Sequence, residues 1–251
     1  MTYAQTSRFL MLRSDVHFGD VLIILNVIYN ISIHEKSKIH LFCDNRRGLV
    51  EELMSVFDYE GRIELVEHIE CELCVDFKLG TFLNTAEYPS WSGELFGKST
   101  IDPFPLERFV LPGLKMKLSK IGRYRCCQLD GRSPQAEKPL MTELELGRIL
   151  ARFCRGMVYH VGGKDRVFKM DGVRNYNGSP KELSQFIYGC DMFFGIDSGM
   201  SHLSGTLGVE SEVFIQSRIE GYASSVEDAY RFMYPTVRTH RRESISHNLL
   251  F

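Results

Sequence analysis

Residues 194–209, FGIDSGMSHLSGTLGV, determine the expected fold, because they are typical of a buried strand that leads through a polar turn into a helix. The mainly apolar run at residues 191–196 suits the interior of a sheet, and apolar residues then recur at helical spacing up to Gly208. A helix start leaves several N–H groups unpaired and carries partial positive charge. Ser198 and Gly199 at this turn therefore offer a place where an anion such as a phosphate docks.

Two further polar residues of this stretch are candidate ligand-binding residues. Asp197 ends the strand, and its carboxylate hydrogen-bonds either a ligand or the amides of its own turn. His202 is expected one helical turn further on, on the ligand side. A lone histidine on a helix is more often a core or surface residue, so the surrounding motif carries its functional interpretation.

The run Asp-Ser-Gly-Met-Ser-His-Leu at residues 197–203, followed by Gly208, resembles the donor-nucleotide motif of the heptosyltransferase-like enzymes of glycosyltransferase family 9. A second match lies near the N-terminus, where a predicted strand at residues 9–13 precedes Gly19 and Asp20. The resemblance implies an α/β fold of GT-B type, with two Rossmann-like parallel-sheet domains facing each other across a cleft. It also implies that Asp20 is the catalytic base, since that family's base follows a glycine after the first strand.

Glycosyl transfer requires a base that takes the acceptor hydroxyl proton and groups that stabilise the departing diphosphate. Asp20 would be the base, with His17 and Asp15 as neighbours that orient it or adjust its protonation. A purely structural role for Asp20 as a helix N-cap is the alternative. The expected donor-binding residues are Arg132, Ser133, Lys164, Asp197, Ser198, Gly199, Met200 and His202.

Both halves of the chain alternate predicted strands and helices, which is typical of parallel sheets whose ligands gather at the carboxyl ends of the strands. The basic run at residues 115–125, KMKLSKIGRYR, precedes a new alternation. We therefore expect an N-terminal acceptor-side domain at residues 1–114 and a C-terminal donor-binding domain at residues 115–251, whose last helix could pack back on the first domain. Strands are expected at residues 9–13, 39–43, 63–66, 73–77, 125–129, 157–160, 192–196 and 212–215, and helices at residues 20–32, 48–57, 142–154, 180–188, 199–207 and 225–232.

The composition permits this interpretation. The chain has 251 residues, 44% of them hydrophobic, and a net charge of −2, which argues against a generally basic nucleic-acid binder. Residues 1–114 hold about 10 basic and 17 acidic side chains, and the remainder about 20 and 15, so the second half is the better anion binder. We expect no signal peptide and no membrane span, because Asn26, Asn30 and His34 interrupt the most apolar run.

Seven scattered cysteines indicate a reduced cytoplasmic protein rather than a secreted disulfide framework. Cys71 and Cys74 have the spacing of zinc ligands, but no second pair follows at a suitable interval, and a buried strand is the favoured interpretation. GT-B enzymes generally work without a metal. We therefore expect no metal site and no cofactor, with the nucleotide sugar as co-substrate.

The sequence thus predicts an inverting, metal-independent glycosyltransferase that moves a sugar from a nucleotide-sugar donor to an acceptor hydroxyl. The resemblance implies a saccharide acceptor. Basic runs at residues 115–125 and 238–242 leave open a hydroxylated base in DNA, as in phage DNA glycosylation, although each run is also typical of a solvated surface. Two alternatives remain, a nucleotide-sugar epimerase or hydrolase on the same fold, and a non-catalytic nucleotide-sugar or nucleic-acid binding module.

Overall fold

The chain divides into two compact units, Met1–Met116 and Lys117–Phe251. Each unit is built around a parallel sheet. The structure is a computed structural model, and the residues it describes are 7–12, 17–43, 46–59, 61–68, 75–76, 109–130, 143–153, 156–163, 167–215 and 220–241.

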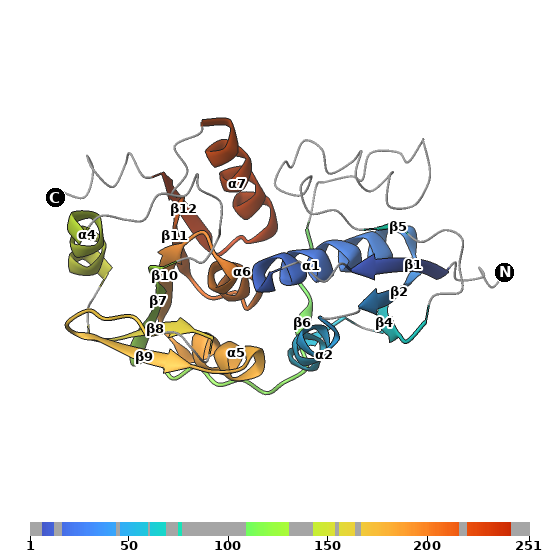
Figure 1. Cartoon of the computed structure of the whole chain (residues 1–251), viewed down its shortest axis with the longest axis horizontal. Helices are drawn as coiled ribbons and strands as arrows, with labels where there is room; N and C mark the ends of the chain where they lie inside the picture. Colours follow the sequence, from blue (N-terminus) through green and yellow to red (C-terminus); the bar gives the residue numbers. More distant parts are fainter. Residues whose placement is uncertain are drawn as a thin grey trace. The chain divides into compact units, whose positions relative to one another are not determined.

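The first unit holds a four-stranded parallel sheet in the order β4-β2-β1-β5 (Figure 1). Helix α1 connects β1 to β2 and helix α2 lies between β2 and β4, so both crossovers run in the same direction along the sheet. Right-handed connections then put both helices on one face. The elements are β1 (Ser7–Leu12), α1 (Phe18–Glu35), β2 (Lys38–Cys43), α2 (Arg47–Val56), β3 (Phe57–Asp58), β4 (Ile63–Val66), β5 (Val75–Asp76) and β6 (Gly113–Leu114), with β3 and β6 forming a separate antiparallel pair.

Helix α1 is buried on all sides along residues 21–32, as expected of a helix that is apolar all round. Its two asparagines are satisfied inside the unit. The Asn30 side-chain amide donates to the Val110 carbonyl at 2.9 Å and accepts from the Val110 N–H at 2.8 Å, and the Tyr59 hydroxyl donates to the Asn26 side chain at 3.4 Å. Asn30 therefore anchors the segment at Val110, and Asn26 links α1 to Tyr59. Across the described ranges, no helix combines the length and the apolar character that a bilayer crossing requires.

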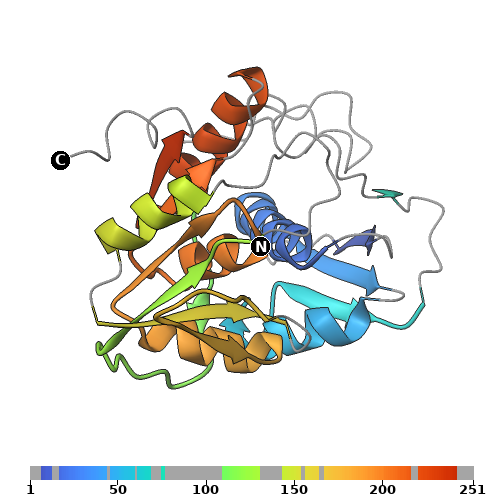
Figure 2. The ribbon, with the colours of Figure 1, turned by 60° about the vertical axis from the view of Figure 1, so that its left-hand side comes forward.

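The second unit holds a six-stranded parallel sheet in the order β12-β11-β10-β7-β8-β9. Helix α4 covers one face, and α5, α6 and α7 cover the other (Figures 1 and 2). The elements are β7 (Tyr124–Gln128), α4 (Glu143–Phe153), β8 (Met157–Gly162), β9 (Val173–Asn177), α5 (Pro180–Gly189), β10 (Met192–Ile196), α6 (Gly199–Thr206), β11 (Ser211–Ile215), α7 (Glu220–Met233) and β12 (Val237–Arg241).

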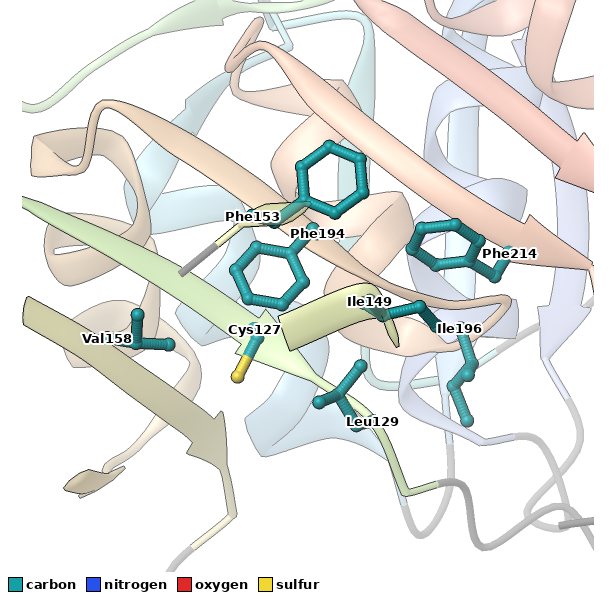
Figure 3. Close-up of a cluster of buried hydrophobic side chains, with 8 residues drawn as sticks. All are labelled: Cys127, Leu129, Ile149, Phe153, Val158, Phe194, Ile196 and Phe214. Atoms are coloured by element: carbon teal, nitrogen blue, oxygen red, sulfur yellow. The ribbon is translucent and has the colours of Figure 1, made fainter. Parts of the chain in front are cut away.

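The core between α4 and the sheet consists of aromatic and aliphatic side chains (Figure 3). Phe153 of α4 stacks on Phe194 of β10, with ring centroids 5.6 Å apart, and meets Phe214 of β11 edge to face at 5.9 Å. Burial of each such side chain contributes about 1.5 to 3 kcal/mol. This core holds β10 and β11 firmly beneath the turn that follows β10. The buried members are Cys127, Leu129, Ile149, Phe153, Val158, Phe194, Ile196 and Phe214.

The expected strands and helices of the described residues are present, with ends that shift by a few residues, and the α/β fold with two parallel sheets is confirmed. Four strands were not predicted, the two-residue strands β3 and β6, and the longer strands β9 and β12. Strands β9 and β12 lie at the edges of the second sheet, and the residues VRNYN and VRTHR show no run of buried apolar positions. Charged residues on β12 are typical of an edge strand that avoids pairing with other chains.

Candidate functional site

The turn between β10 and α6 has the predicted strand–turn–helix geometry. Helix α6 begins at Gly199, directly after the carboxyl end of β10, and ends before Gly208, whose φ is +68°. The Gly208 N–H donates to the Gly205 carbonyl and the Val209 N–H to the Ser204 carbonyl, both at 3.0 Å. These two bonds form a Schellman motif, in which glycine adopts the left-handed conformation at no steric cost.

The first turn of α6 has no side-chain cap. Ser198 is the N-cap residue, but its hydroxyl makes no capping hydrogen bond and lies 3.3 Å from the hydroxyl of Ser201. Helix α5 differs, because the Ser179 hydroxyl accepts from the Glu182 N–H at 3.3 Å and the Glu182 carboxylate accepts from the Ser179 N–H at 2.8 Å. The start of α5 is thus satisfied by its own side chains, whereas the start of α6 presents backbone N–H groups suited to an anion.

This turn lies beside the point where the strand order of the second sheet reverses. From β7 the chain adds β8 and β9 on one side and then β10, β11 and β12 on the other. In open parallel sheets, ligands bind outside the carboxyl ends of the two strands at such a reversal. Strands β7 and β10 approach closely there, since a Cβ on Gly195 would lie 2.5 Å from the Gln128 carbonyl oxygen. The predicted motif therefore stands at the topological ligand position of its sheet.

A buried polar network lies directly behind the turn. The Tyr230 hydroxyl donates to Asp197 Oδ1 at 3.0 Å and lies 3.3 Å from His202 Nε2. His202 Nδ1 lies 3.2 Å from the Tyr234 hydroxyl, and Asp197 Oδ1 lies 3.6 Å from His202 Nε2. The side chains of Asp197 and His202 are only 8% and 7% exposed. Burial, and secondly the charge of Asp197, raise the pKa of Tyr230 well above its ordinary value.

A second polar pair lies near the carboxyl ends of β7 and β8. His160 is fully buried, its Nε2 lies 2.7 Å from Asp130 Oδ1, and its ring stacks on Phe168 with centroids 4.4 Å apart. The contact is short, but its geometry is not that of a well-aligned hydrogen bond. Asp130 and His160 border the same edge of the sheet as Asp197.

In the first unit, Asp20 belongs to the first turn of α1, as its third residue, and His17 is the N-cap. The Asp20 carboxylate accepts a hydrogen bond from the His17 N–H at 3.0 Å. The order of the first sheet reverses between β1 and β5, and α1 follows β1, so Asp20 comes after the strand at the reversal. The residue thus stands at the position that the same topological rule assigns to ligands.

The structure brings together five of the predicted donor-binding residues. Asp197, Ser198 and Gly199 form the turn, and His202 lies behind it. Met200 is buried, so its backbone rather than its side chain borders the turn. The other predicted site residues, Asp15, Arg132, Ser133 and Lys164, lie outside the described residues, as do Cys71 and Cys74.

The second basic run is partly neutralised by carboxylates. His240 Nε2 lies 2.5 Å from Glu212, and Arg241 Nε lies 3.0 Å from Glu227. Arg238 is 80% exposed and lies 3.8 Å from Glu212. In the first run, the Arg125 guanidinium donates to the Phe153 carbonyl and Lys120 lies over the Tyr188 ring. Carboxylates therefore pair with part of the charge of the second run, whereas the two contacts in the first run are with a carbonyl and an aromatic ring.

No sequence pattern indicated Asp130, Tyr230 or Tyr234 as site residues. One signal was present, since Tyr230 lies in the helix predicted at residues 225–232 and Tyr234 follows it by four residues, the spacing of side chains that share a helical face. No local pattern indicates that this face meets the turn after β10. Among the residues that the structure describes, no three His, Cys, Asp or Glu side chains gather as metal ligands would.

No protein-family model matches the sequence, and no characterised protein matches it by sequence comparison. Solved structures do match its fold. The heptosyltransferase TibC of E. coli, an iron-containing dodecamer solved with ADP-D-β-D-heptose, superimposes with a TM-score of 0.61 at 12% identity over 93% of this chain. This chain spans less than two thirds of TibC, 58% in one structure and 62% in this one.

Two further structures match over most of both chains. E. coli heptosyltransferase WaaC with ADP has a TM-score of 0.54 at 12% identity, over 93% of each chain. The glycosyl transferase family 9 protein from Veillonella parvula has a TM-score of 0.52 at 11% identity, over 96% of this chain and 87% of that one. At these identities the similarity shows the fold, which is that of GT-B glycosyltransferases.

Proposed function

We propose that this chain, which has the fold of the heptosyltransferase-like GT-B glycosyltransferases, transfers a sugar from a nucleotide-sugar donor to an acceptor hydroxyl. The observation that carries the proposal is the uncapped start of α6 at the strand-order reversal of its sheet. Backbone N–H groups at such a helix start are suited to a diphosphate. Asp197, Ser198, Gly199 and Met200 would form the donor site there, with His202 behind the turn.

An ADP-linked sugar is the donor class to test first, because the structural neighbours TibC and WaaC were solved with ADP-heptose and ADP. Arg132, Ser133 and Lys164 follow the neighbouring strands β7 and β8 in the sequence. Their cationic and hydroxyl groups would add charge-assisted contacts to the phosphates. We propose that no metal is needed for this binding.

We propose Asp20 as the general base. In a single displacement the acceptor oxygen forms a bond to the anomeric carbon, the bond from that carbon to the diphosphate oxygen breaks, and the acceptor proton passes to the Asp20 carboxylate. The anomeric configuration inverts as a consequence. The hydrogen bond from the His17 N–H supports this role because it orients the carboxylate, and Asp15 and His17 are the neighbours proposed to assist.

A saccharide is the proposed acceptor. The carboxylates of Glu212 and Glu227 pair with the basic residues of β12, which lowers the cationic charge that a DNA backbone would need. The buried free thiols of Cys43, Cys126, Cys127 and Cys190 support a cytoplasmic location, where thiols stay reduced.

The test is a donor panel followed by a transfer assay with the full chain. ADP, UDP, GDP, CMP and their sugar conjugates are each titrated calorimetrically, and any donor that binds is then incubated with saccharides and with DNA containing hydroxymethylated bases. Selective binding of one nucleotide sugar and its transfer to a saccharide are the expected results. Binding followed by epimerised or hydrolysed donor, without transfer, would replace the proposal by the epimerase or hydrolase alternative. No binding by any nucleotide would refute the donor site.

A further inference from the structure

Tyr230 of α7 and Tyr234, which directly follows α7, reach the polar network behind the turn. Tyr230 and Tyr234 are fully buried, and the Tyr230 ring stacks on the His202 imidazole with centroids 4.7 Å apart and planes at 12°. Tyr234 packs against the backbone of α6, because a Cβ on Gly205 would lie 2.6 Å from the Tyr234 ring. Close packing on both sides therefore holds the two hydroxyl groups in place.

Proton counting assigns a direction to each hydrogen bond. A carboxylate only accepts, and a phenol has a single proton to donate. Tyr230 donates that proton to Asp197, so the 3.3 Å contact of its oxygen with His202 is a hydrogen bond only in the tautomer that carries the proton on Nε2. In the neutral ring Nδ1 then accepts from the Tyr234 hydroxyl at 3.2 Å. The chain of donors runs from Tyr234 through His202 and Tyr230 to Asp197.

The surroundings of Tyr230 support this direction. Its hydroxyl lies away from water and close to a negative charge, and both factors favour the neutral phenol, as the raised pKa of Tyr230 indicates. Tyr230 therefore remains a donor to Asp197 throughout the neutral pH range. Both ring nitrogens of His202 are engaged by tyrosines.

We propose that Tyr230 and Tyr234 are positioning residues of the donor site. They hold His202 in the Nε2–H tautomer and fix the orientation of the Asp197 carboxylate, so that α7 determines how the turn after β10 meets its ligand. His202 then acts through Asp197 and the packing of the turn rather than as a direct phosphate ligand. The functional part of this inference rests on the proposed function, because Asp197 belongs to the donor site proposed there.

The tautomer is tested by NMR of protein labelled with ¹⁵N-histidine, with the His202 signals identified by their loss in His202→Gln. The expected spectrum has a protonated Nε2 and an unprotonated Nδ1. Tyr230→Phe should shift mainly the Nε2 signal, and Tyr234→Phe mainly the Nδ1 signal. A protonated Nδ1 in the neutral wild-type ring, or signals that neither variant moves, would overturn the assignment.

The effect on binding is tested by calorimetric titration of the same variants with ADP. Tyr230→Phe keeps the ring that stacks on His202, and the dissociation constant for ADP should rise at least about tenfold. Tyr124→Phe is the matched control, since Tyr124 is also a buried tyrosine, whose hydroxyl donates to the Phe186 carbonyl at 2.7 Å. Tyr124 begins β7, which runs parallel to β10, so it lies at the end of the sheet opposite the turn. The control substitution should lower the melting temperature, but its dissociation constant for ADP should stay within about twofold of the wild-type value.

If Tyr124→Phe and Tyr230→Phe weaken ADP binding equally, the effect comes from lost stability, and the positioning role is overturned. ADP binding by Tyr230→Phe at wild-type strength would do the same. If the wild-type protein binds neither ADP nor another nucleoside diphosphate, the proposed function fails, and the NMR result still decides whether the tyrosines hold His202 and Asp197.

Discussion

Asp20 combines a structural contact with a proposed chemical role. Its carboxylate accepts from the His17 N–H and so satisfies one of the open donors at the start of α1. The same carboxylate is the proposed base. A substitution that removes the whole side chain therefore changes two properties at once, and only a side chain that keeps the hydrogen bond without the basicity separates them.

Asp20→Asn is expected to lower turnover by a factor of about 10² to 10⁴, because the amide accepts the His17 N–H but takes no proton from an acceptor. Donor affinity and melting temperature should stay near the wild-type values. Initial rates and calorimetric titration measure the two effects. Asp20→Ala is the comparison, with the same loss of rate and an added loss of about 0.5 to 1.5 kcal/mol in stability. Turnover at the wild-type rate in Asp20→Asn would refute the proposal that Asp20 is the general base.

Gly205 permits a close contact that no other residue allows. A Cβ at this position would lie 2.6 to 3.0 Å from three atoms of Tyr234. Gly205→Ala is expected to lower the free energy of unfolding by about 1 to 3 kcal/mol, because the buried tyrosine must shift. Gly147 on α4 provides a control, since nothing lies within 4 Å of a Cβ there, and Gly147→Ala should stabilise by up to about 1 kcal/mol. Urea denaturation measures both, and equal effects would contradict the close packing of Tyr234.

At the scale of the elements, α5 and α6 form a natural comparison. Both begin with a serine at the N-cap position and both follow a strand, yet only the α5 serine caps its helix. The capping box of Ser179 and Glu182 uses the open donors of α5 for stability. Helix α6 has no side-chain cap, and its third residue is Ser201 where α5 has Glu182. The two helices therefore share the N-cap serine but not the capping box.

Ser179→Ala is expected to cost about 1 kcal/mol in stability and to leave ADP binding unchanged, because it removes the cap of α5, three strands away from β10 in the sheet order. Ser198→Ala should cost less stability, since its hydroxyl makes no capping bond, and should weaken ADP binding. Thermal melting and calorimetry on the two variants give the comparison. The reverse pattern, with stability lost only in Ser198→Ala, would show that the Ser198 side chain serves the helix rather than a ligand.

At the scale of the whole molecule, both units bury groups that must stay neutral. Burial raises the pKa of the Cys43 thiol in the first unit from its ordinary 9.0 to about 12. Burial likewise raises the pKa of Tyr230 in the second unit above its ordinary 10.0. The unfolded chain loses these protons at lower pH than the folded chain does, so alkaline conditions favour unfolding of both units.

These groups should therefore contribute their full stabilisation below pH 9. Above pH 9 the free energy of unfolding should fall as the pH rises. For Cys43 the decline is expected between pH 9 and about 12, at up to about 1.4 kcal/mol per pH unit. Urea denaturation at pH 8, 9, 10 and 10.5, followed by circular dichroism, measures it. Cys43→Ala should show a shallower decline between pH 9 and 10 than the wild type, and a stability that stays constant to pH 10.5 would contradict the burial of both groups.

Local patterns predicted the elements whose side chains are buried on a regular period. The apolar run before Asp197, the helical spacing after it and Gly208 at the end sufficed for β10 and α6, because strand, helix and cap each depend on neighbours within a few residues. Strands β9 and β12 were missed for the opposite reason. Edge strands bury little apolar side-chain surface, so their sequences lack a regular apolar pattern. They are recognised as strands only from their pairing with β8 and β11.

Short-range periodicity and turn chemistry were enough to predict the α/β class, the two parallel sheets and the strand–turn–helix motif at residues 194–209. Only the tertiary structure decided that this strand stands at the reversal of its sheet, that Ser198 leaves α6 uncapped, and that Tyr230 and Tyr234 reach Asp197 and His202. Tyr230 lies 33 positions from Asp197 along the chain. Contacts at that separation depend on how α7 packs on the sheet, which no local pattern specifies.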